Sequence, residues 1–321
     1  MIFEKQIVAG YEKQFGVRSD DTGIAYYFSS ADFKGLHAAP YFFENGQGKT
    51  LKGYFYWYDT PKKGRLVVFD HGFGGGHRSY MREIERICRE GYLVFSYDHT
   101  GCMESEGERT HGLGRSLFDL DACFCALKKE EALKDTAFSV IGHSWGGYSA
   151  MNISALHPEI ANVVVLSGFV SVKRQIDCFF KGLPQGYKRA VLAYELAQNG
   201  RYAEFDGLET LKNTKARVLL VYSENDRLVQ KKLHYDPLYA ALKDRENVSF
   251  LLEKKKGHNP NYTEEAVDRL AEYTKLLQKK QKKKELATEE ARRAFVSSQD
   301  FKSMTEQDEQ VWQEIFEVLK A

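Results

Sequence analysis

Ser144 stands at the centre of a G-x-S-x-G pattern formed by residues 142–146. The apolar run 137–141 directly before it predicts a strand, and residues 147–157 directly after it predict a helix that a proline ends. A strand-to-helix turn this tight strains its central residue and projects that side chain above the carboxyl edge of the sheet. The pattern therefore predicts a nucleophilic serine, with helix N–H groups facing developing negative charge. We expect the side chain of the preceding His143 to point away from the active face.

The elements that must position this serine are short apolar runs separated by amphipathic stretches of helical length. The runs are rich in β-branched and aromatic residues and are apolar throughout, which predicts strands covered on both faces. They cover residues 53–58, 65–70, 92–97, 137–143, 162–166, 217–223 and 248–252. Strand and helix alternate, so we predict an α/β fold with a mostly parallel central sheet and helices on both faces. Residues 41–44 and 53–58 are predicted to form an antiparallel hairpin at one edge.

Two further turns contain glycine and follow predicted strands. Residues 71–76 read HGFGGG after the strand 65–70, and residues 97–107 read YDHTGCMESEG after the strand 92–97. The first turn has neither a Walker lysine nor G-x-G-x-x-G spacing with an acidic partner, so it does not predict a nucleotide site. Together with the serine turn, and in this order, the two turns resemble the α/β-hydrolase family over roughly residues 50–277.

This resemblance implies roles for residues in both turns. The first turn matches the family's HGxxG pattern, which implies that the backbone N–H groups of Phe73 and Trp145 form an oxyanion hole. His71 is expected to brace its own turn by hydrogen bonding. The second turn is similar to the family's YDxxGxGxSxG pattern, except that Cys102 and Met103 stand where small residues are common. We expect an architectural role for it.

The resemblance also implies a base and an acid that activate the serine. A serine hydroxyl is a poor nucleophile without a base, and that base needs an orienting acid. In this family the acid and then the histidine follow late strands. Asp226 follows the strand 217–223 in the family's D-x-x-V turn, and His258 follows the strand 248–252. We predict a Ser144–His258–Asp226 triad, with Glu224 as the alternative acid.

Composition favours a soluble cytoplasmic protein. The net charge is +1, from 46 basic and 45 acidic residues, so nothing suggests a nucleic-acid partner. The five cysteines lack paired spacing and predict reduced thiols rather than disulfides or a zinc site. The first residues lack a signal-peptide pattern, and no apolar stretch is long enough for stable membrane insertion. The lysine-rich segment 279–284 is predicted to be a solvated helix face.

Five segments are expected along the chain. They are an N-terminal extension (1–48), two parts of an α/β-hydrolase core (49–169 and 216–280), a helical cap between them (170–215) and a C-terminal helical extension (281–321). The start of the chain, residues 2–15, is expected to form a helix over the sheet edge. The last segment carries an apolar stripe at helical spacing, formed by Val311, Trp312, Ile315, Phe316 and Leu319. We expect this stripe to pack on its own domain, with a homodimer contact as the alternative.

The predicted activity is hydrolysis of a carboxylic ester of small or medium acyl length through an acyl-enzyme, with no metal and no cofactor. The substrate would be a small-molecule ester or a related acyl compound. A thioesterase, an acyltransferase and a serine aminopeptidase would use the same triad and remain alternatives, as does a catalytically idle binding protein. Aromatic residues of the cap region, among them Phe169 and Phe179, are expected to line an apolar pocket or to form the cap's own core.

Overall fold

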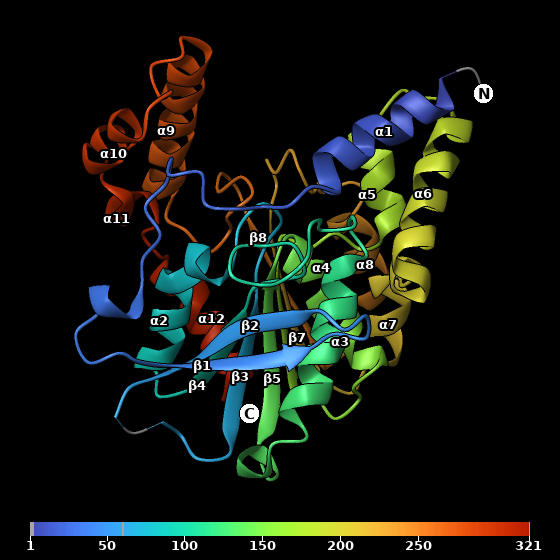
Figure 1. Ribbon diagram of the computed structural model, residues 1–321. Coiled ribbons are helices and arrows are strands. Elements are labelled where there is room, and N and C mark those ends of the chain that lie inside the picture. The colour runs from blue at the N-terminus through green and yellow to red at the C-terminus, as the bar shows by residue number, and fades with distance from the viewer. Residues whose placement is uncertain (1–2, 60, 321) are drawn as a thin grey trace.

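The computed structural model describes residues 3–59 and 61–320 and contains one eight-stranded sheet (Figure 1). The strand order is β1-β2-β4-β3-β5-β6-β7-β8. Strands β1 and β2 are antiparallel to their neighbours, whereas β4, β3, β5, β6, β7 and β8 run parallel to one another. The strands are β1 (His37–Glu44), β2 (Thr50–Trp57), β3 (Arg65–Asp70), β4 (Leu93–Tyr97), β5 (Ala137–His143), β6 (Asn162–Leu166), β7 (Arg217–Ser223) and β8 (Val248–Glu253). The predicted α/β class, the parallel sheet and the edge hairpin are confirmed.

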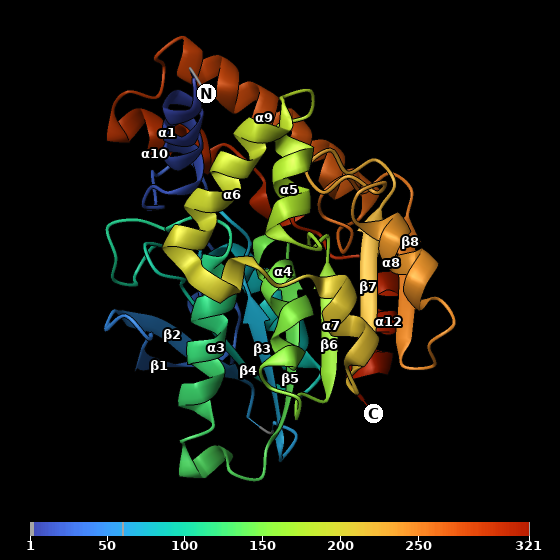
Figure 2. The same ribbon diagram turned by 90° about the vertical axis from the view of Figure 1, so that its right-hand side faces the viewer.

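Helices cover both faces of this sheet (Figure 2). They are α1 (Glu4–Phe15), α2 (Met81–Arg89), α3 (Arg115–Leu127), α4 (Trp145–Asn152), α5 (Val172–Phe179), α6 (Gln185–Asn199), α7 (Gly207–Asn213), α8 (Tyr235–Leu242), α9 (Glu264–Lys282), α10 (Glu289–Ser297), α11 (Phe301–Met304) and α12 (Glu309–Leu319). Among the described residues, no helix combines the length and the apolar character needed to cross a membrane.

The two faces of the sheet carry separate hydrophobic cores. Leu66 and Val68 of β3 belong to the core beneath α3 and α4, whereas Val67 and Phe69 belong to the core beneath α2 and α12. Successive side chains of a strand point to opposite faces, so a strand covered on both sides needs apolar residues at every position. This is the physical reason why the strands appear in the sequence as continuous apolar runs.

The cap consists of α5, α6 and α7 between β6 and β7, and α1 packs along α6 rather than along the sheet (Figures 1 and 2). The expectation of an N-terminal helix is confirmed for residues 4–15, and residue 2 lies outside the described part of the chain. Its expected place over the sheet edge is wrong. The helix buries Tyr11 and Phe15 against the cap region instead.

A buried carboxylate joins α1, the cap and the core. Glu195 of α6 accepts hydrogen bonds from the Tyr11 hydroxyl at 2.5 Å, from the backbone N–H groups of Leu113 and Gly114 at 2.7 and 3.0 Å, and from the Asn199 amide at 3.0 Å. Burial raises the pKa of Glu195. Four donors compensate for the loss of water around this carboxylate, so the N-terminal helix is fixed to the cap at a defined position.

The C-terminal extension returns to the sheet through α12. Its apolar stripe is buried against the sheet face that also carries α2, and Trp312 is completely buried. The packing of this stripe on its own domain is confirmed, and a dimer contact through the same residues is wrong because they are not accessible. Helices α9, α10 and α11 form a separate small cluster around Tyr273 and Phe295, seen at the upper left of Figure 1.

Candidate active site

Ser144 occupies the turn between β5 and α4 in a strained conformation, with φ of 55° and ψ of −106°. Glycines on both sides make this turn possible. A Cβ atom on Gly142 would overlap the carbonyl oxygen of Gly146, and a Cβ atom on Gly146 would overlap the carbonyl oxygen of Asp70 at the end of β3. The strand, the helix and the neighbouring strand therefore meet at a distance that only glycine allows, and the serine hydroxyl projects from their junction.

Three side chains from separate loops form a continuous hydrogen-bond chain at this junction. His258 Nε2 lies 2.8 Å from Ser144 Oγ, and His258 Nδ1 lies 2.7 Å from Asp226 Oδ2. The second carboxylate oxygen of Asp226 accepts the backbone N–H groups of Leu228 and Val229 at 2.8 and 3.0 Å, which fixes the carboxylate in place. The structure thus brings together the three residues expected from the sequence. The alternative acid, Glu224, is exposed to solvent.

The two N–H groups expected to bind an oxyanion border the same space. Phe73 follows β3, and Trp145 is the first residue of α4, where a helix N–H has no acceptor in its own helix. His71 holds the turn before Phe73: its Nε2 accepts the backbone N–H of His99 at 3.1 Å, so Nδ1 carries the proton and donates to the Gly72 carbonyl at 2.8 Å. Burial lowers the pKa of His71 to about 4. The expected bracing role of His71 is confirmed.

Residues 61–242, more than half of the chain, match the family model described as serine aminopeptidase, S33. The chain belongs to this family of α/β-hydrolases. The matched part of the hydrolase includes Phe73, Ser144 and Asp226 but ends before His258.

Sequence relatives of the hydrolase include peptidases and lipases. It is 24% identical to a proline iminopeptidase of Saccharolobus solfataricus over 191 residues, which cover 57% of this chain and 59% of the relative. It is 29% identical to human monoglyceride lipase over 130 residues, which cover 40% of this chain and 43% of the lipase. The matches therefore span only about half the length of these relatives. An esterase of Pyrococcus furiosus has the same fold, with a TM-score of 0.59, 21% identity and coverage of 80% of this chain and 97% of the esterase.

The serine of the hydrolase opens into a cavity of about 220 Å³. Its walls are largely aromatic and come from the core, the cap and the N-terminal helix. The lining residues are Gln14, Phe15, Gly72, Phe73, Tyr80, Leu113, His143, Ser144, Trp145, Phe169, Gln175, Phe179, Leu228 and His258. Phe15 stacks on Phe179 with ring centres 5.0 Å apart and lies 5.4 Å from the ring of Phe73. These contacts make α1 part of the cavity wall.

His143 lies beside the hydrogen-bond chain, so the expectation that it points away from the active face is wrong. The Tyr80 hydroxyl accepts the Gly72 N–H at 3.0 Å and donates to His143 Nδ1 at 2.7 Å, and His143 Nε2 then donates to the His258 carbonyl at 2.8 Å. Burial, together with the neighbouring His258, lowers the pKa of His143 to about 3. A neutral His143 thus connects the turn before Phe73 to the backbone of His258.

A buried ionic network supports the serine turn from below. His99 Nε2 lies 3.0 Å from Asp70 and its Nδ1 lies 3.4 Å from Asp119, and all three side chains are completely buried. Burial acts to lower the pKa of His99, but the two carboxylates outweigh it and raise this pKa to about 9. The imidazolium lies against the ring of Trp145, with ring centres 4.6 Å apart. The charges therefore fix the packing beneath α4.

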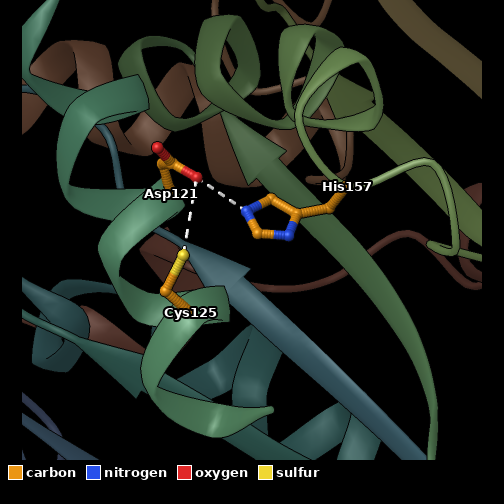
Figure 3. Close-up of side chains that lie close together, drawn as sticks. All are labelled: Asp121, Cys125 and His157. Atoms are coloured by element: carbon orange, nitrogen blue, oxygen red, sulfur yellow. Dashed lines mark hydrogen bonds and ion pairs between the residues drawn. The ribbon is translucent and has the colours of Figure 1, made fainter.

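Asp121, Cys125 and His157 form a separate cluster whose ligand atoms lie within 4.8 Å of one another (Figure 3). The atoms of His157 and Asp121 that would bind a metal ion already take part in hydrogen bonds. The ammonium of Lys128 lies 2.8 Å from His157 Nδ1, so Nε2 carries the proton and donates to Asp121 at 2.7 Å, while the Tyr202 hydroxyl donates to the other oxygen of Asp121 at 2.5 Å. A lysine cation at this distance would also repel a metal ion. We interpret the cluster as a polar link between α3 and the cap region.

Sequence reasoning missed several residues that border the cavity, among them Phe15, Tyr80, His143 and Gln175. Phe15 lies in a segment without a motif, and Tyr80 and Gln175 carry no pattern that marks them. Only His143 had a signal, its place next to Ser144, and its orientation depends on the approach of Tyr80 and His258 from elsewhere in the chain.

Proposed function

We propose that this α/β-hydrolase cleaves neutral carboxylic esters of short to medium acyl length through an acyl-enzyme on Ser144. The observation that carries the proposal is the hydrogen-bond chain from Ser144 through His258 to Asp226. His258 accepts the hydroxyl proton as Ser144 Oγ attacks the ester carbonyl, and Asp226 stabilises the imidazolium that forms. The alcohol leaves with a proton from His258. Water activated by His258 then releases the acid and restores the serine.

The cavity favours a neutral ester over the other substrates of this mechanism. Among the described residues that line it, none carries a carboxylate, an ammonium or a guanidinium group. An aminopeptidase substrate would bring a charged amine into this space, and a buried charge without a partner is strongly disfavoured. The volume of about 220 Å³ lies below the usual range for sites that hold drug-sized ligands, which favours a small acyl group.

Reaction with a fluorophosphonate tests the proposal directly. Ser144 Oγ attacks phosphorus and fluoride leaves, so mass spectrometry of the digested protein should find the adduct on the peptide that contains Ser144. Hydrolysis of p-nitrophenyl butyrate should fall in proportion to labelling. If folded protein neither takes up the label nor hydrolyses any ester in a series of acyl lengths, the proposal is wrong and a binding function becomes the better explanation.

Replacing Phe15 with alanine should move the preferred acyl chain toward greater length. Phe15 is only 6% exposed and packs against Phe73 and Phe179 in the cavity wall, so its removal should enlarge the space beside Ser144. We expect kcat/KM for p-nitrophenyl octanoate relative to the butyrate to rise about tenfold, because space for roughly two more buried CH₂ groups, at about 0.8 kcal/mol each, lowers the barrier by about 1.6 kcal/mol. The matched control is Phe3→Ala next to the same helix, where the side chain is 60% exposed. An unchanged chain-length profile in Phe15→Ala would show that α1 does not limit the pocket.

A further inference from the structure

The His258 loop (residues 256–263) joins β8 to α9, and the C-terminal extension contacts it on both sides of the histidine. Before the histidine, the ammonium of Lys256 lies 2.7 Å from Oδ2 of Asp308. After the histidine, the backbone carbonyl of Asn261 accepts the backbone N–H of Asp308 at 2.8 Å. One residue of the extension therefore reaches the His258 loop from both directions, through its side chain and through its backbone.

The residues next to Asp308 extend this contact. The backbone N–H of Thr263 donates to the Glu306 carbonyl at 3.0 Å. The side-chain oxygen of Gln307 accepts the Asn261 amide at 2.9 Å and the indole N–H of Trp312 at 2.8 Å. Because Trp312 is completely buried in the core beneath the sheet, the His258 loop is connected to a fixed part of the fold.

The ion pair between Lys256 and Asp308 is largely shielded from water. Lys256 is only 4% exposed, and its ammonium also lies 3.0 Å from the carboxylate of Glu253. The second oxygen of Asp308 accepts the backbone N–H groups of Gln310 and Val311 at 2.9 and 3.1 Å, which caps α12. Burial acts to raise the pKa of Asp308, but the hydrogen bonds from Lys256 and these N–H groups outweigh it and lower this pKa. A charged carboxylate in a fixed position therefore faces Lys256.

The backbone around Lys256 is also connected to the end of β7, just before the acid of the triad. The N–H of Lys256 donates to Ser223 Oγ at 3.1 Å, and the N–H of Gly257 donates to Asn225 Oδ1 at 2.8 Å. These bonds hold one side of the turn, and the ion pair holds the side chain of Lys256 on the other. The position of Lys256 therefore fixes the start of the turn that presents the His258 imidazole.

We propose that Asp308 is a positioning residue: by holding Lys256, it keeps the His258 imidazole aligned with its two partners in the triad. The inference rests on the function proposed above and makes the C-terminal extension part of the catalytic machinery. Asp308 does not line the cavity, so it acts through the His258 loop alone. Precise placement matters here, because a shift of about 1 Å in a reacting group can reduce the rate by about a hundredfold.

Asp308→Asn tests the inference while preserving the helix cap. Asparagine is also a good capping residue, so its amide oxygen can accept the N–H groups of Gln310 and Val311. Its amide nitrogen then faces the Lys256 ammonium, and two donors cannot pair. We expect kcat for p-nitrophenyl butyrate to fall about tenfold while KM changes less than about twofold, because binding in the cavity is unaffected. The rate of fluorophosphonate labelling should fall by the same factor as kcat.

Asp300→Asn is the matched control. Asp300 is exposed and caps a different helix, α11, by accepting the N–H of Ser303. Its replacement makes the same chemical change at a helix cap without touching Lys256, so kcat should change less than about twofold. Any loss that comes from the cap rather than from the ion pair would appear in both variants.

A second substitution tests whether the two charged residues act together. Lys256→Met keeps an unbranched side chain without the ammonium and should lower kcat about as much as Asp308→Asn. The double variant should lose less than about twofold beyond either single variant, because residues that act as a unit do not give independent losses. Thermal unfolding of each variant verifies the fold, and either single variant carries the test if the other does not fold.

The outcomes separate this inference from the proposed function. Unchanged kcat in Asp308→Asn, an equal loss in Asp300→Asn, or losses that multiply in the double variant would overturn the role of Asp308 and leave the esterase proposal intact. Absence of both hydrolysis and fluorophosphonate labelling in the natural protein would overturn the esterase proposal and the role of Asp308 with it.

Discussion

Replacing Ser144 with alanine is expected to lower kcat for p-nitrophenyl butyrate by about five to six orders of magnitude, the loss typical when a triad nucleophile is removed. Alanine keeps the size of the side chain but provides no atom to bind the acyl group, although His258 and Asp226 stay in place. A small residual activity should persist, because the N–H groups of Phe73 and Trp145 can still stabilise an oxyanion formed by water. Fluorophosphonate labelling should disappear.

Ser167→Ala is the matched control for this prediction. Ser167 follows β6 as Ser144 follows β5, and both serines have a positive φ, of 47° and 55°. Ser167 is completely buried and its hydroxyl has no hydrogen-bond partner among the described residues, so alanine there should change kcat less than about twofold. Equal losses in the two variants would point to damage of the sheet edge rather than to a nucleophile. Activity that survives in Ser144→Ala would contradict the acyl-enzyme.

The sequence was sufficient for the sheet and for the serine turn because both depend on local patterns. A parallel strand buried on two faces must be apolar at every position, so β3, β5, β6 and β7 begin and end where the apolar runs do. The serine turn needs glycine on both sides for steric reasons that are visible in a few residues. The C-terminal helix could be predicted in the same way, because its apolar stripe needs a surface to cover.

The walls of the cavity could not be predicted, because they depend on contacts between segments far apart in the chain. Nothing in residues 4–15 shows that α1 lies on α6, a position that the buried bond between Tyr11 and Glu195 helps to fix. The orientation of His143 is set by Tyr80, 63 residues away, and by His258, 115 residues away. Substrate specificity is therefore the property on which the structure adds most.

Replacing Asp226 with asparagine is expected to lower kcat by about four orders of magnitude with little effect on the fold. The oxygen of the new amide can still accept the N–H groups of Leu228 and Val229, so its nitrogen must face His258 Nδ1. That donor forces the neutral imidazole to carry its proton on Nε2, where it can no longer accept the proton of Ser144. The loss should appear in kcat rather than in KM, because Asp226 does not line the cavity.

Glu224→Gln removes a carboxylate two residues earlier and is the matched control for Asp226→Asn. Glu224 is exposed and the carboxylate that contacts His258 is that of Asp226, so kcat should change less than about twofold. This pair of variants decides between the two acids that the sequence left open, because both follow β7 and both could reach a histidine loop. A large loss in Glu224→Gln with near-normal activity in Asp226→Asn would assign the acid to Glu224 and require a rearranged loop during catalysis.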